Sequence, residues 1–249
     1  MNTKFPKTEL LLKNSKPIDK LKIEDALLIM VEEHKEAAII VKNQIDKIKN
    51  IINRIYKHLI SHSKGRIIYT GCGTSGRIAM QDGVELYPTF NWPKERVDFL
   101  IGGGKRAILS SVENAEDDIS QAEKDFSLIK PNNNDILIGI AASGNTPYTC
   151  SILEKGLLNN CLTVSISNNL EGEILKFGKL NVVLDTKEEV VAGSTRLKAG
   201  TAQKICLNLI STMLMVKMGR VENGLMTNLV PTNKKLFKRL ELINKHLKK

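Results

Sequence analysis

Between residues 64 and 231, short apolar segments alternate with longer helical patterns. The apolar segments are hydrophobic at consecutive positions, which is typical of strands buried on both faces of a parallel sheet. Helices that connect parallel strands cover those two faces. The pattern therefore predicts an α/β fold, a doubly wound five-stranded parallel sheet flanked by helices. The expected strands cover 66–70, 97–101, 135–140, 162–166 and 181–184, and the expected helices among them cover 76–86, 115–126, 148–159 and 170–177.

Helical patterns also flank the alternating region. Apolar residues recur at three- and four-residue spacing over 24–63, which predicts a long helix that packs on the core. Two further helices are expected over 197–218 and 234–246. We therefore divide the chain into three parts: an N-terminal tail and long helix (1–63), the α/β domain (64–231), and a basic C-terminal helix or tail (232–249).

Positive charge gathers at the two ends of the chain. The 249 residues include 37 Lys and Arg against 27 Asp and Glu, a formal net charge of +10. Residues 1–22 hold six Lys and two acidic residues, and residues 232–249 hold seven Lys and Arg and one Glu. The centre is consequently neutral and lacks the basic stripe of a nucleic-acid binder, so no nucleic-acid partner is expected.

Hydropathy and cysteine spacing exclude further classes of protein. The longest apolar runs, such as residues 26–31, are far shorter than a membrane span, and the N-terminus has no apolar signal-peptide core. The four cysteines form no CxxC pair and no metal-ligand spacing. We expect reduced thiols in a cytoplasmic protein with no membrane partner and no bound metal.

Two loops rich in glycine and hydroxyl groups follow the first and third expected strands. Loop 1 (71–77, GCGTSGR) offers Gly73, Thr74, Ser75 and Gly76, and loop 2 (141–147, AASGNTP) offers Ser143, Gly144, Asn145 and Thr146. Ligands of doubly wound folds bind at the carboxyl ends of the strands. Helix N-termini and short hydroxyl donors suit a phosphate monoester. Helix capping alone would explain one such loop, but two at neighbouring strand ends favour phosphate binding.

Loop 1 also matches the GxGxxG fingerprint of dinucleotide-binding sites. That interpretation requires an acidic residue at the end of the second strand, where it would hold the ribose hydroxyls. The expected second strand ends in Ile101-Gly102, and Asp98 stands at its other end. A nicotinamide cofactor is therefore disfavoured.

These loops and several longer stretches resemble the SIS (sugar isomerase) domain family of phosphosugar-binding proteins, and within it the N-acetylmuramic acid 6-phosphate etherases. The most specific stretch is AGSTRLKAGTAQK (192–204). The others are IIYTGCGTSGR (67–77), VELYPTF (84–90), IGGGKRAI (101–108), VENAEDD (112–118), LIGIAASGNTPY (137–148) and GRVENGLM (219–226).

The resemblance implies both a fold and an activity. The family fold is a five-stranded parallel sheet between helices, usually dimeric, with the active site near the dimer contact. The implied enzyme is a lyase that converts N-acetylmuramic acid 6-phosphate into N-acetylglucosamine 6-phosphate and D-lactate without a cofactor. Its functional glutamates correspond to Glu85 in VELYPTF and Glu116 in VENAEDD. The resemblance also implies a small phosphorylated amino sugar as ligand, a homodimer, and a further helical region beyond Lys249.

Cleavage of a lactyl ether at C3 of an open-chain sugar aldehyde requires two proton transfers. A base removes the C2 proton, which the C1 carbonyl acidifies, and an acid protonates the departing oxygen before water adds. Carboxyl groups with raised pKa values can do both. All four histidines lie outside residues 66–231, so carboxylates must do this work unless the N-terminal helix or another subunit delivers a histidine. This disfavours a histidine-dependent sugar-phosphate isomerase.

The position of Glu85 raises a question of reach. A continuous helix rises about 14 Å from Gly76 to Glu85, at about 1.5 Å per residue. Either that helix ends early, near Gly83, or Glu85 serves the site of a partner subunit. Glu116 is expected to open a helix within the acidic run 113–118.

Ser194 and Arg196 are the remaining candidate ligands. Together with Lys198 they are expected to begin the helix over 197–218, where a cation opposes the helix dipole unless it binds an anion. Arg196 and Lys198 would hold the phosphate or the lactyl carboxylate, and Arg favours a bidentate contact with a carboxylate.

The sequence departs from the family pattern at a few positions. Leu86-Tyr87 replace the usual Cys-Pro beside the first glutamate, Asn145 stands where Arg is common, Asn223-Gly224 reverse the common Gly-Asn, and Asn228 replaces a common Asp. Both glutamates are retained, which favours the etherase. The alternatives are a non-catalytic phosphosugar-binding regulator and a sugar-phosphate isomerase, because one fold hosts many functions.

Overall fold

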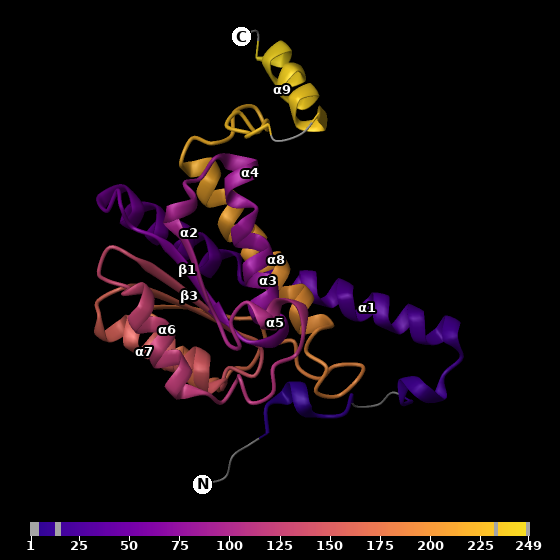
Figure 1. The fold of residues 1–249 in the computed structure, drawn as a ribbon. Helices are drawn as coiled ribbons and strands as arrows, with labels where there is room; N and C mark the ends of the chain where they lie inside the picture. Colours follow the sequence, from indigo (N-terminus) through magenta and orange to yellow (C-terminus); the bar gives the residue numbers. More distant parts are fainter. Residues whose placement is uncertain (1–4, 13–15, 232–233, 248–249) are drawn as a thin grey trace.

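A computed structural model describes residues 5–12, 16–231 and 234–247 of the chain. Five parallel strands form one sheet in the order β2-β1-β3-β4-β5 (Figure 1). They are β1 (Ile67–Gly71), β2 (Val97–Ile101), β3 (Ile136–Ala141), β4 (Leu162–Ser167) and β5 (Leu180–Val183). Each strand lies within one residue of its expected bounds, and the doubly wound α/β fold is confirmed.

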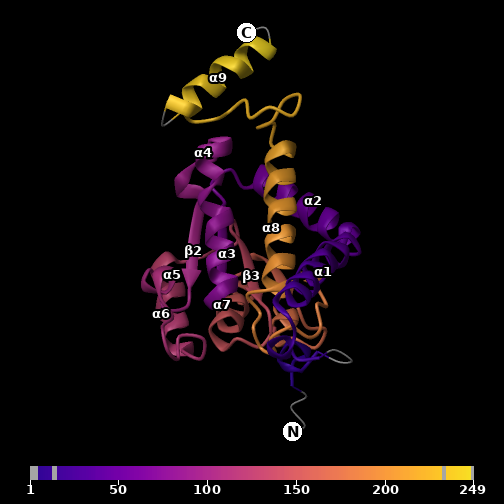
Figure 2. The ribbon, with the colours of Figure 1, turned by 90° about the vertical axis from the view of Figure 1, so that its right-hand side faces the viewer.

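Helices cover both faces of the sheet (Figures 1 and 2). The α-helices are α1 (Ile23–Lys42), α2 (Ile45–Ser61), α3 (Gly73–Val84), α4 (Leu86–Phe90), α5 (Arg106–Leu109), α6 (Ile119–Ile129), α7 (Pro147–Leu158), α8 (Lys198–Lys217) and α9 (Lys234–His246). Single 3-10 turns are η1 (Lys7–Glu9), η2 (Ile18–Lys20), η3 (Lys94–Arg96) and η4 (Glu173–Lys176). No helix within the described ranges combines the length and apolar character needed to cross a bilayer.

Successive residues of each central strand enter two separate hydrophobic cores. Along β3, Ile138 and Ile140 belong to the core formed with α2, α3 and α8, whereas Leu137 belongs to the core formed with α6 and α7. All three side chains are buried. The unbroken apolar runs in the sequence are therefore explained by burial on both faces of the sheet.

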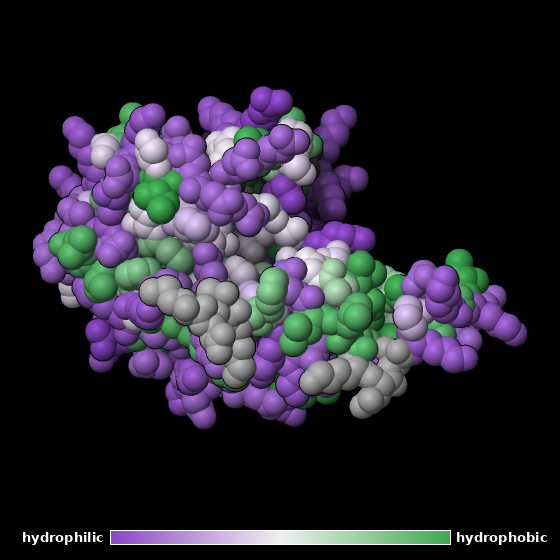
Figure 3. Space-filling model, turned by 90° about the horizontal axis from the view of Figure 1, so that it is seen from below, coloured by the Kyte–Doolittle hydropathy of each residue, from purple (hydrophilic) through white to green (hydrophobic). Residues whose placement is uncertain are grey.

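The single helix expected over 24–63 is divided in two. The chain leaves helical geometry at Gln44, and α2 then lays Ile48, Ile51 and Ile55 against the sheet. Only the last part of α1 is buried, against α8, and the rest projects from the body as an arm (Figure 1). Because the two apolar faces serve different partners, one straight helix cannot bury both. Seen from below, hydrophobic side chains gather near this arm (Figure 3).

The helix expected over 170–177 is also wrong, since that segment forms only the single turn η4. Apart from the bonds of that turn, its backbone is tied to loop 2. The N–H of Ile174 donates to the Gly144 carbonyl at 2.8 Å, and the N–H of Glu173 donates to Asn145 Oδ1 at 2.9 Å. These bonds hold the segment against the loop and prevent a longer helix.

A buried carboxylate joins α3 to α8. Asp82 Oδ1 accepts hydrogen bonds from Asn208 Nδ2 at 2.6 Å and from Ser211 Oγ at 3.1 Å, and the Tyr69 hydroxyl donates to Asp82 Oδ2 at 3.3 Å. Burial raises the pKa of Asp82, and the three donors only partly oppose that effect. The ionised carboxylate is thus costly in the folded state although its hydrogen bonds are made.

We expect Asp82→Asn to unfold at a higher temperature than the wild type near pH 7.5. A carboxyl whose folded-state pKa is raised contributes stability at low pH that is lost as the pH rises through that pKa, and Asn has no such loss. The gain should disappear toward pH 4, near the unfolded pKa of about 3.9. Thermal unfolding across this pH range measures it. Asp82→Ala is the control, because it leaves the Asn208 donor unpaired at a cost of about 1–3 kcal/mol. Equal decreases in the unfolding temperature of both variants would mean that the ionised Asp82 carboxylate is not costly in the folded state.

Candidate active site

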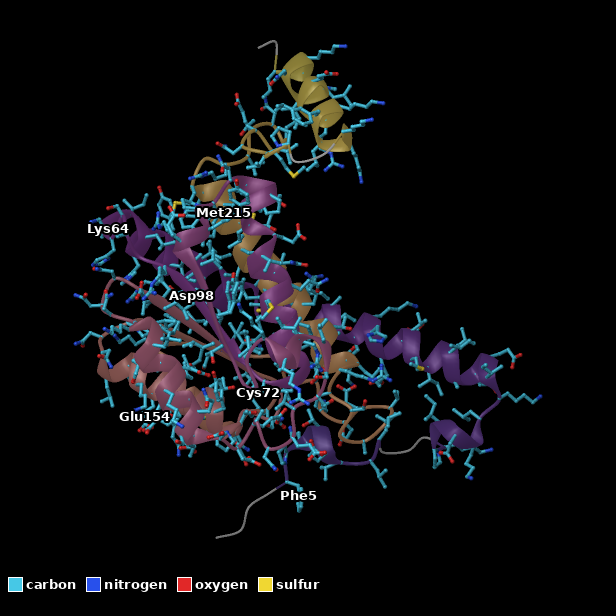
Figure 4. All side chains as sticks on the ribbon, viewed as in Figure 1. Phe5, Lys64, Cys72, Asp98, Glu154 and Met215 are labelled. Carbon is cyan, nitrogen blue, oxygen red and sulfur yellow. The ribbon has the colours of Figure 1, made fainter. Side chains whose placement is uncertain are left out.

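Loops 1 and 2 lie side by side where the winding of the sheet reverses. The chain moves outward from β1 to β2 and then returns to β3 on the other side of β1, so β1 and β3 are neighbours with Gly71 opposite Ile140. Ligands of open α/β sheets bind at such a reversal, beyond the carboxyl ends of the strands. Figure 4 shows Cys72, which follows β1, at the lower end of the sheet.

Loop 1 passes directly into α3 and leaves its polar groups available. Gly73 has a φ of +52° and is the first residue of the helix. A Cβ on Gly76 would lie 2.7 Å from the Gly71 carbonyl oxygen, so glycine is needed for helix and strand to approach. The hydroxyls of Thr74 and Ser75 make no hydrogen bond within the described part of the chain. With the first N–H groups of α3, they form an anion-binding end.

Loop 2 enters α7 with a similar arrangement. Thr146 is the N-cap residue and Pro147 follows at the first position, but the Thr146 hydroxyl does not cap the helix. Ser143 Oγ accepts a hydrogen bond from the Asn145 N–H at 3.1 Å. The Thr146 side chain is thus left for a ligand, whereas Asn145 is partly occupied by its bond to Glu173.

The tight turn at Gly144 offers a test of loop 2. Gly144 and Gly219 have similar φ values of +76° and +71°, which cost an L-residue about 1–2 kcal/mol. A Cβ on Gly144 would lie 2.5 Å from Gly172 Cα, whereas one on Gly219 would have nothing within 4 Å. We therefore expect Gly144→Ala to lower the urea-measured free energy of unfolding by clearly more than Gly219→Ala does. Equal losses would show that the contact with Gly172 is unimportant.

Glu116 connects the two loops. A Cβ on Gly73 would lie 3.0 Å from Glu116 Oε1, so this carboxylate stands directly over the first turn of α3. The Tyr148 N–H, in the first turn of α7, donates to the Glu116 carbonyl oxygen at 2.9 Å. Burial and, to a smaller extent, the neighbouring Asp117 raise the pKa of Glu116, while Arg77 lowers it. Glu116 is accessible to solvent, and an accessible carboxyl with a raised pKa beside an anion-binding loop is suited to proton transfer.

The local structure around Glu116 differs from the expectation that it opens a helix. Glu116 lies in a turn, and α6 begins only at Ile119. Asp118 is the N-cap, and its side chain accepts a hydrogen bond from the Gln121 N–H at 2.8 Å. Asn114 has a φ of +58°, which ends any helical path before Glu116. The turn directs Glu116 toward loop 1 instead of along a helix axis.

Glu85 lies at the other end of α3, away from the loops. The helix ends at Val84, one residue past Gly83, and this end does not bring Glu85 back toward loop 1. From Gly73 to Glu85 the helix axis rises about 18 Å. Glu85 is exposed, and α4, which follows it, lies above the sheet and below α9 in Figure 1. Glu85 and Glu116 of one chain therefore do not meet in one site.

Ser194 and Arg196 lie in a turn before α8, not in its first turn as expected. The turn adjoins loop 1, because a Cβ on Gly200 would lie 3.2 Å from the Thr195 carbonyl oxygen and 3.4 Å from Thr74 Cγ2. Ser194 is half-buried. Arg196 is exposed and has no ion pair or hydrogen bond to a described residue, so its guanidinium is available to an anion.

Lys198 does not have the anion-binding role considered for it. The residue is only 5% exposed, and its side chain forms an ion pair with Glu33 of α1. The N-terminus of α8 is occupied as well, since Glu189 accepts the N–H groups of Lys198 at 3.0 Å and Ala199 at 2.8 Å. The Glu33 carboxylate thus neutralises Lys198, and the Glu189 carboxylate caps the N-terminus of α8, so neither group is free to bind a ligand anion.

Asn169 is a positioning residue that the sequence did not reveal. It follows β4 and is buried. Its Nδ2 donates to the Ala142 carbonyl of loop 2 at 2.9 Å, and its Oδ1 accepts the Lys7 N–H at 2.8 Å. The N-terminal segment is thereby held against the carboxyl edge of the sheet, next to loop 2. No local motif marks this contact, because Lys7 and Asn169 are 162 residues apart.

The arrangement gives no support to a dinucleotide or metal site. Asp98 lies at the amino end of β2, where it pairs with Arg66 at 3.3 Å. Among the described residues, no three His, Cys, Asp or Glu side chains are grouped to hold a metal ion. The four cysteines are free and buried.

Comparisons with known proteins agree with this architecture. Residues 47–157 match the family described as the glucokinase regulatory protein N-terminal SIS domain. An N-acetylmuramic acid 6-phosphate etherase from Bacillus cereus (strain AH187) is 43% identical over 226 residues, which are 91% of this chain and 76% of the relative.

Two solved structures share the fold. One is a putative phosphosugar isomerase involved in capsule formation from Bacteroides fragilis NCTC 9343, with a TM-score of 0.61, 18% identity, and coverage of 82% of this chain and 95% of that one. The other is a phosphoheptose isomerase from Francisella tularensis, with a TM-score of 0.55, 18% identity, and coverage of 81% of this chain and 100% of that one.

Proposed function

The chain belongs to the N-acetylmuramic acid 6-phosphate etherase family, and we propose that it cleaves the D-lactyl ether of N-acetylmuramic acid 6-phosphate to give N-acetylglucosamine 6-phosphate and D-lactate. The observation that carries this proposal is the Glu116 carboxylate beside Gly73, at the end of α3 that is suited to a phosphate. A base and a phosphosugar cradle are thus adjacent, which a dehydrogenase or a nucleic-acid binder does not need.

In this proposal loops 1 and 2 hold the substrate. The phosphate accepts hydrogen bonds from the first N–H groups of α3 and from the hydroxyls of Thr74 and Ser75, and Thr146 of loop 2 supplies a further donor. Arg196, which has no described partner and whose turn adjoins Thr74, holds the lactyl carboxylate. Both anionic groups of the sugar, the phosphate on C6 and the carboxylate of the lactyl group on C3, are then held, and this fixes the position of C3 and of the adjoining C2.

Glu116 acts as the base on the open-chain aldehyde. Its carboxylate takes the C2 proton, the C3–O bond breaks, and the departing D-lactate oxygen receives a proton from a second carboxyl group. Water then adds across the unsaturated aldehyde and restores a hydroxyl at C3. The raised pKa of Glu116 supports this role, because a base is most effective when its pKa approaches the working pH.

Glu85 supplies the second carboxyl group to the site of a partner subunit in a homodimer. The support for this is its exposure, its place at the far end of α3, and the unbroken course of that helix. A carboxylate about 18 Å along the axis from its own loop 1 can serve catalysis only in another copy of the site.

Release of D-lactate from N-acetylmuramic acid 6-phosphate tests the proposed function. The purified chain is expected to produce D-lactate and N-acetylglucosamine 6-phosphate in equal amounts, without added metal or nucleotide. Glu154→Gln is a suitable control, because that residue is exposed on α7 (Figure 4). Tight binding of the substrate with no lactate would contradict the etherase and favour a phosphosugar-binding regulator.

A further inference from the structure

Helix α1 brings a histidine to the start of α8. His34 Nδ1 lies 2.8 Å from Thr201 Oγ1, and the preceding residue of α1, Glu33, pairs with Lys198. These two contacts attach α1 to the first turn of α8. His34 is half-buried, so part of its ring remains accessible.

This part of α8 also borders loop 1. Thr201 follows Gly200, where a Cβ would lie 3.4 Å from Thr74 Cγ2. His34 and loop 1 therefore approach two consecutive residues of α8, Thr201 and Gly200. The exception foreseen from the sequence, a histidine delivered by the N-terminal helix, is what this geometry provides.

The other described histidines lie elsewhere. His58 Nε2 is 3.0 Å from the Asn134 carbonyl oxygen, at the amino end of β3, and His62 stacks on His58. His246 is on α9, at the opposite end of the molecule from the lower ends of the strands (Figure 1). Among the described residues, His34 is thus the one imidazole beside the site.

The orientation of His34 leaves one basic nitrogen for a ligand. When Nδ1–H donates to Thr201 Oγ1, Nε2 carries a lone pair, and Nε2 has no partner in the described part of the chain. An imidazole with one free nitrogen can accept a proton and return it, whereas the ammonium of Lys198 is held in an ion pair and a guanidinium such as that of Arg196 offers only donors.

We propose that His34 is a catalytic residue that opens the pyranose ring of the substrate. This inference rests on the proposed function, because elimination at C2 and C3 requires the C1 aldehyde and an amino sugar in water is mostly a closed ring. His34 Nε2 takes the proton of the O1 hydroxyl as the C1=O1 bond forms and the C1–O5 bond breaks. The same nitrogen then returns a proton to O5, so that the step is balanced with no net uptake.

Exchange between the α and β anomers of N-acetylmuramic acid 6-phosphate isolates this step. Ring opening and closing interconvert the anomers, and exchange NMR measures the rate. We expect the Glu116→Gln variant to exchange the anomers faster than they exchange spontaneously, although this variant cannot eliminate lactate. Adding His34→Gln to that variant should slow the enzyme-catalysed exchange about 100-fold or more, toward the spontaneous rate.

Two further variants separate chemistry from folding. Thr201→Val removes the bond that orients the ring and should slow the exchange while α1 keeps its Glu33–Lys198 pair. His62→Gln is the matched control, since His62 is also half-buried and bonded to a carbonyl, 2.9 Å away, but lies at the other end of the sheet. It should leave the exchange unchanged.

The outcomes distinguish this inference from the proposed function. Two results overturn the role of His34 even if the wild type releases lactate. One is exchange that persists when His34→Gln is added to the Glu116→Gln variant, and the other is no exchange in the Glu116→Gln variant although it binds the substrate. Exchange that depends on His34 in a protein that releases no lactate supports the ring-opening role and rejects the etherase.

Discussion

Glu116→Gln is expected to release D-lactate about 10³-fold more slowly than the wild type while still binding the substrate. Gln has the same shape and keeps the contact over Gly73, but it cannot take the C2 proton. The backbone bond from Tyr148 to the Glu116 carbonyl is unaffected by the change, so the turn should remain in place. Steady-state lactate release and calorimetric binding separate the loss of kcat from any loss of affinity.

The pH profile gives this prediction a second, independent readout. A base must be ionised, so kcat/KM should fall as the pH drops through the pKa of Glu116, which lies above the ordinary value of about 4.3. Removing the charge of Asp117 lowers that pKa, and removing the charge of Arg77 raises it. We therefore expect the acidic limb to move to lower pH in Asp117→Asn and to higher pH in Arg77→Gln. A limb that stays in place in both variants would mean that another group is the base.

Features of the fold that depend on residues close together in the sequence were predicted well. Strand bounds were correct to within one residue, because burial on both faces of a strand produces unbroken apolar runs. Loops 1 and 2 were correctly placed at adjacent strands, since glycine and hydroxyl residues directly precede helices. The segment 170–177 was mistaken for a helix because its apolar spacing does not reveal the bonds that tie it to loop 2.

The parts that depend on distant residues were not predictable in the same way. Lys198 looked like a free cation at a helix N-terminus, and only the fold shows that Glu33, 165 residues earlier, neutralises it. The approach of Glu116 to Gly73 depends on a turn that folds back across the sheet edge. The helix was expected to begin at Gly76, so the start of α3 at Gly73, with its positive φ, was not predicted.

The second large loss of activity is expected at Glu85, which we assign to the site of a partner subunit. Glu85→Ala should abolish lactate release, although its side chain is exposed and lies far from loops 1 and 2 of its own chain. An exposed glutamate at the end of a helix contributes little to folding, so the free energy of unfolding should change by no more than about 0.5 kcal/mol. Loss of activity without loss of stability would identify Glu85 as part of a site rather than of the core.

Complementation between two inactive variants tests whether Glu85 acts in the site of its own chain or in that of the partner subunit. If the site is shared, a dimer of one Glu85→Ala chain and one Glu116→Gln chain contains one site with both carboxylates intact and one with neither. Co-expression with two different affinity tags, followed by purification through both, isolates this mixed dimer, and we expect it to regain about half of the wild-type activity. A dimer of the Glu116→Gln chain with the Glu85→Ala, Glu116→Gln double variant is the matched control and should stay inactive, because neither chain supplies Glu116.

Two results would contradict the shared site. A mixed dimer that regains no activity would show that Glu85 acts within its own chain, which would require α3 to unwind before Val84. A Glu85→Ala homodimer that stays fully active would remove Glu85 from the mechanism.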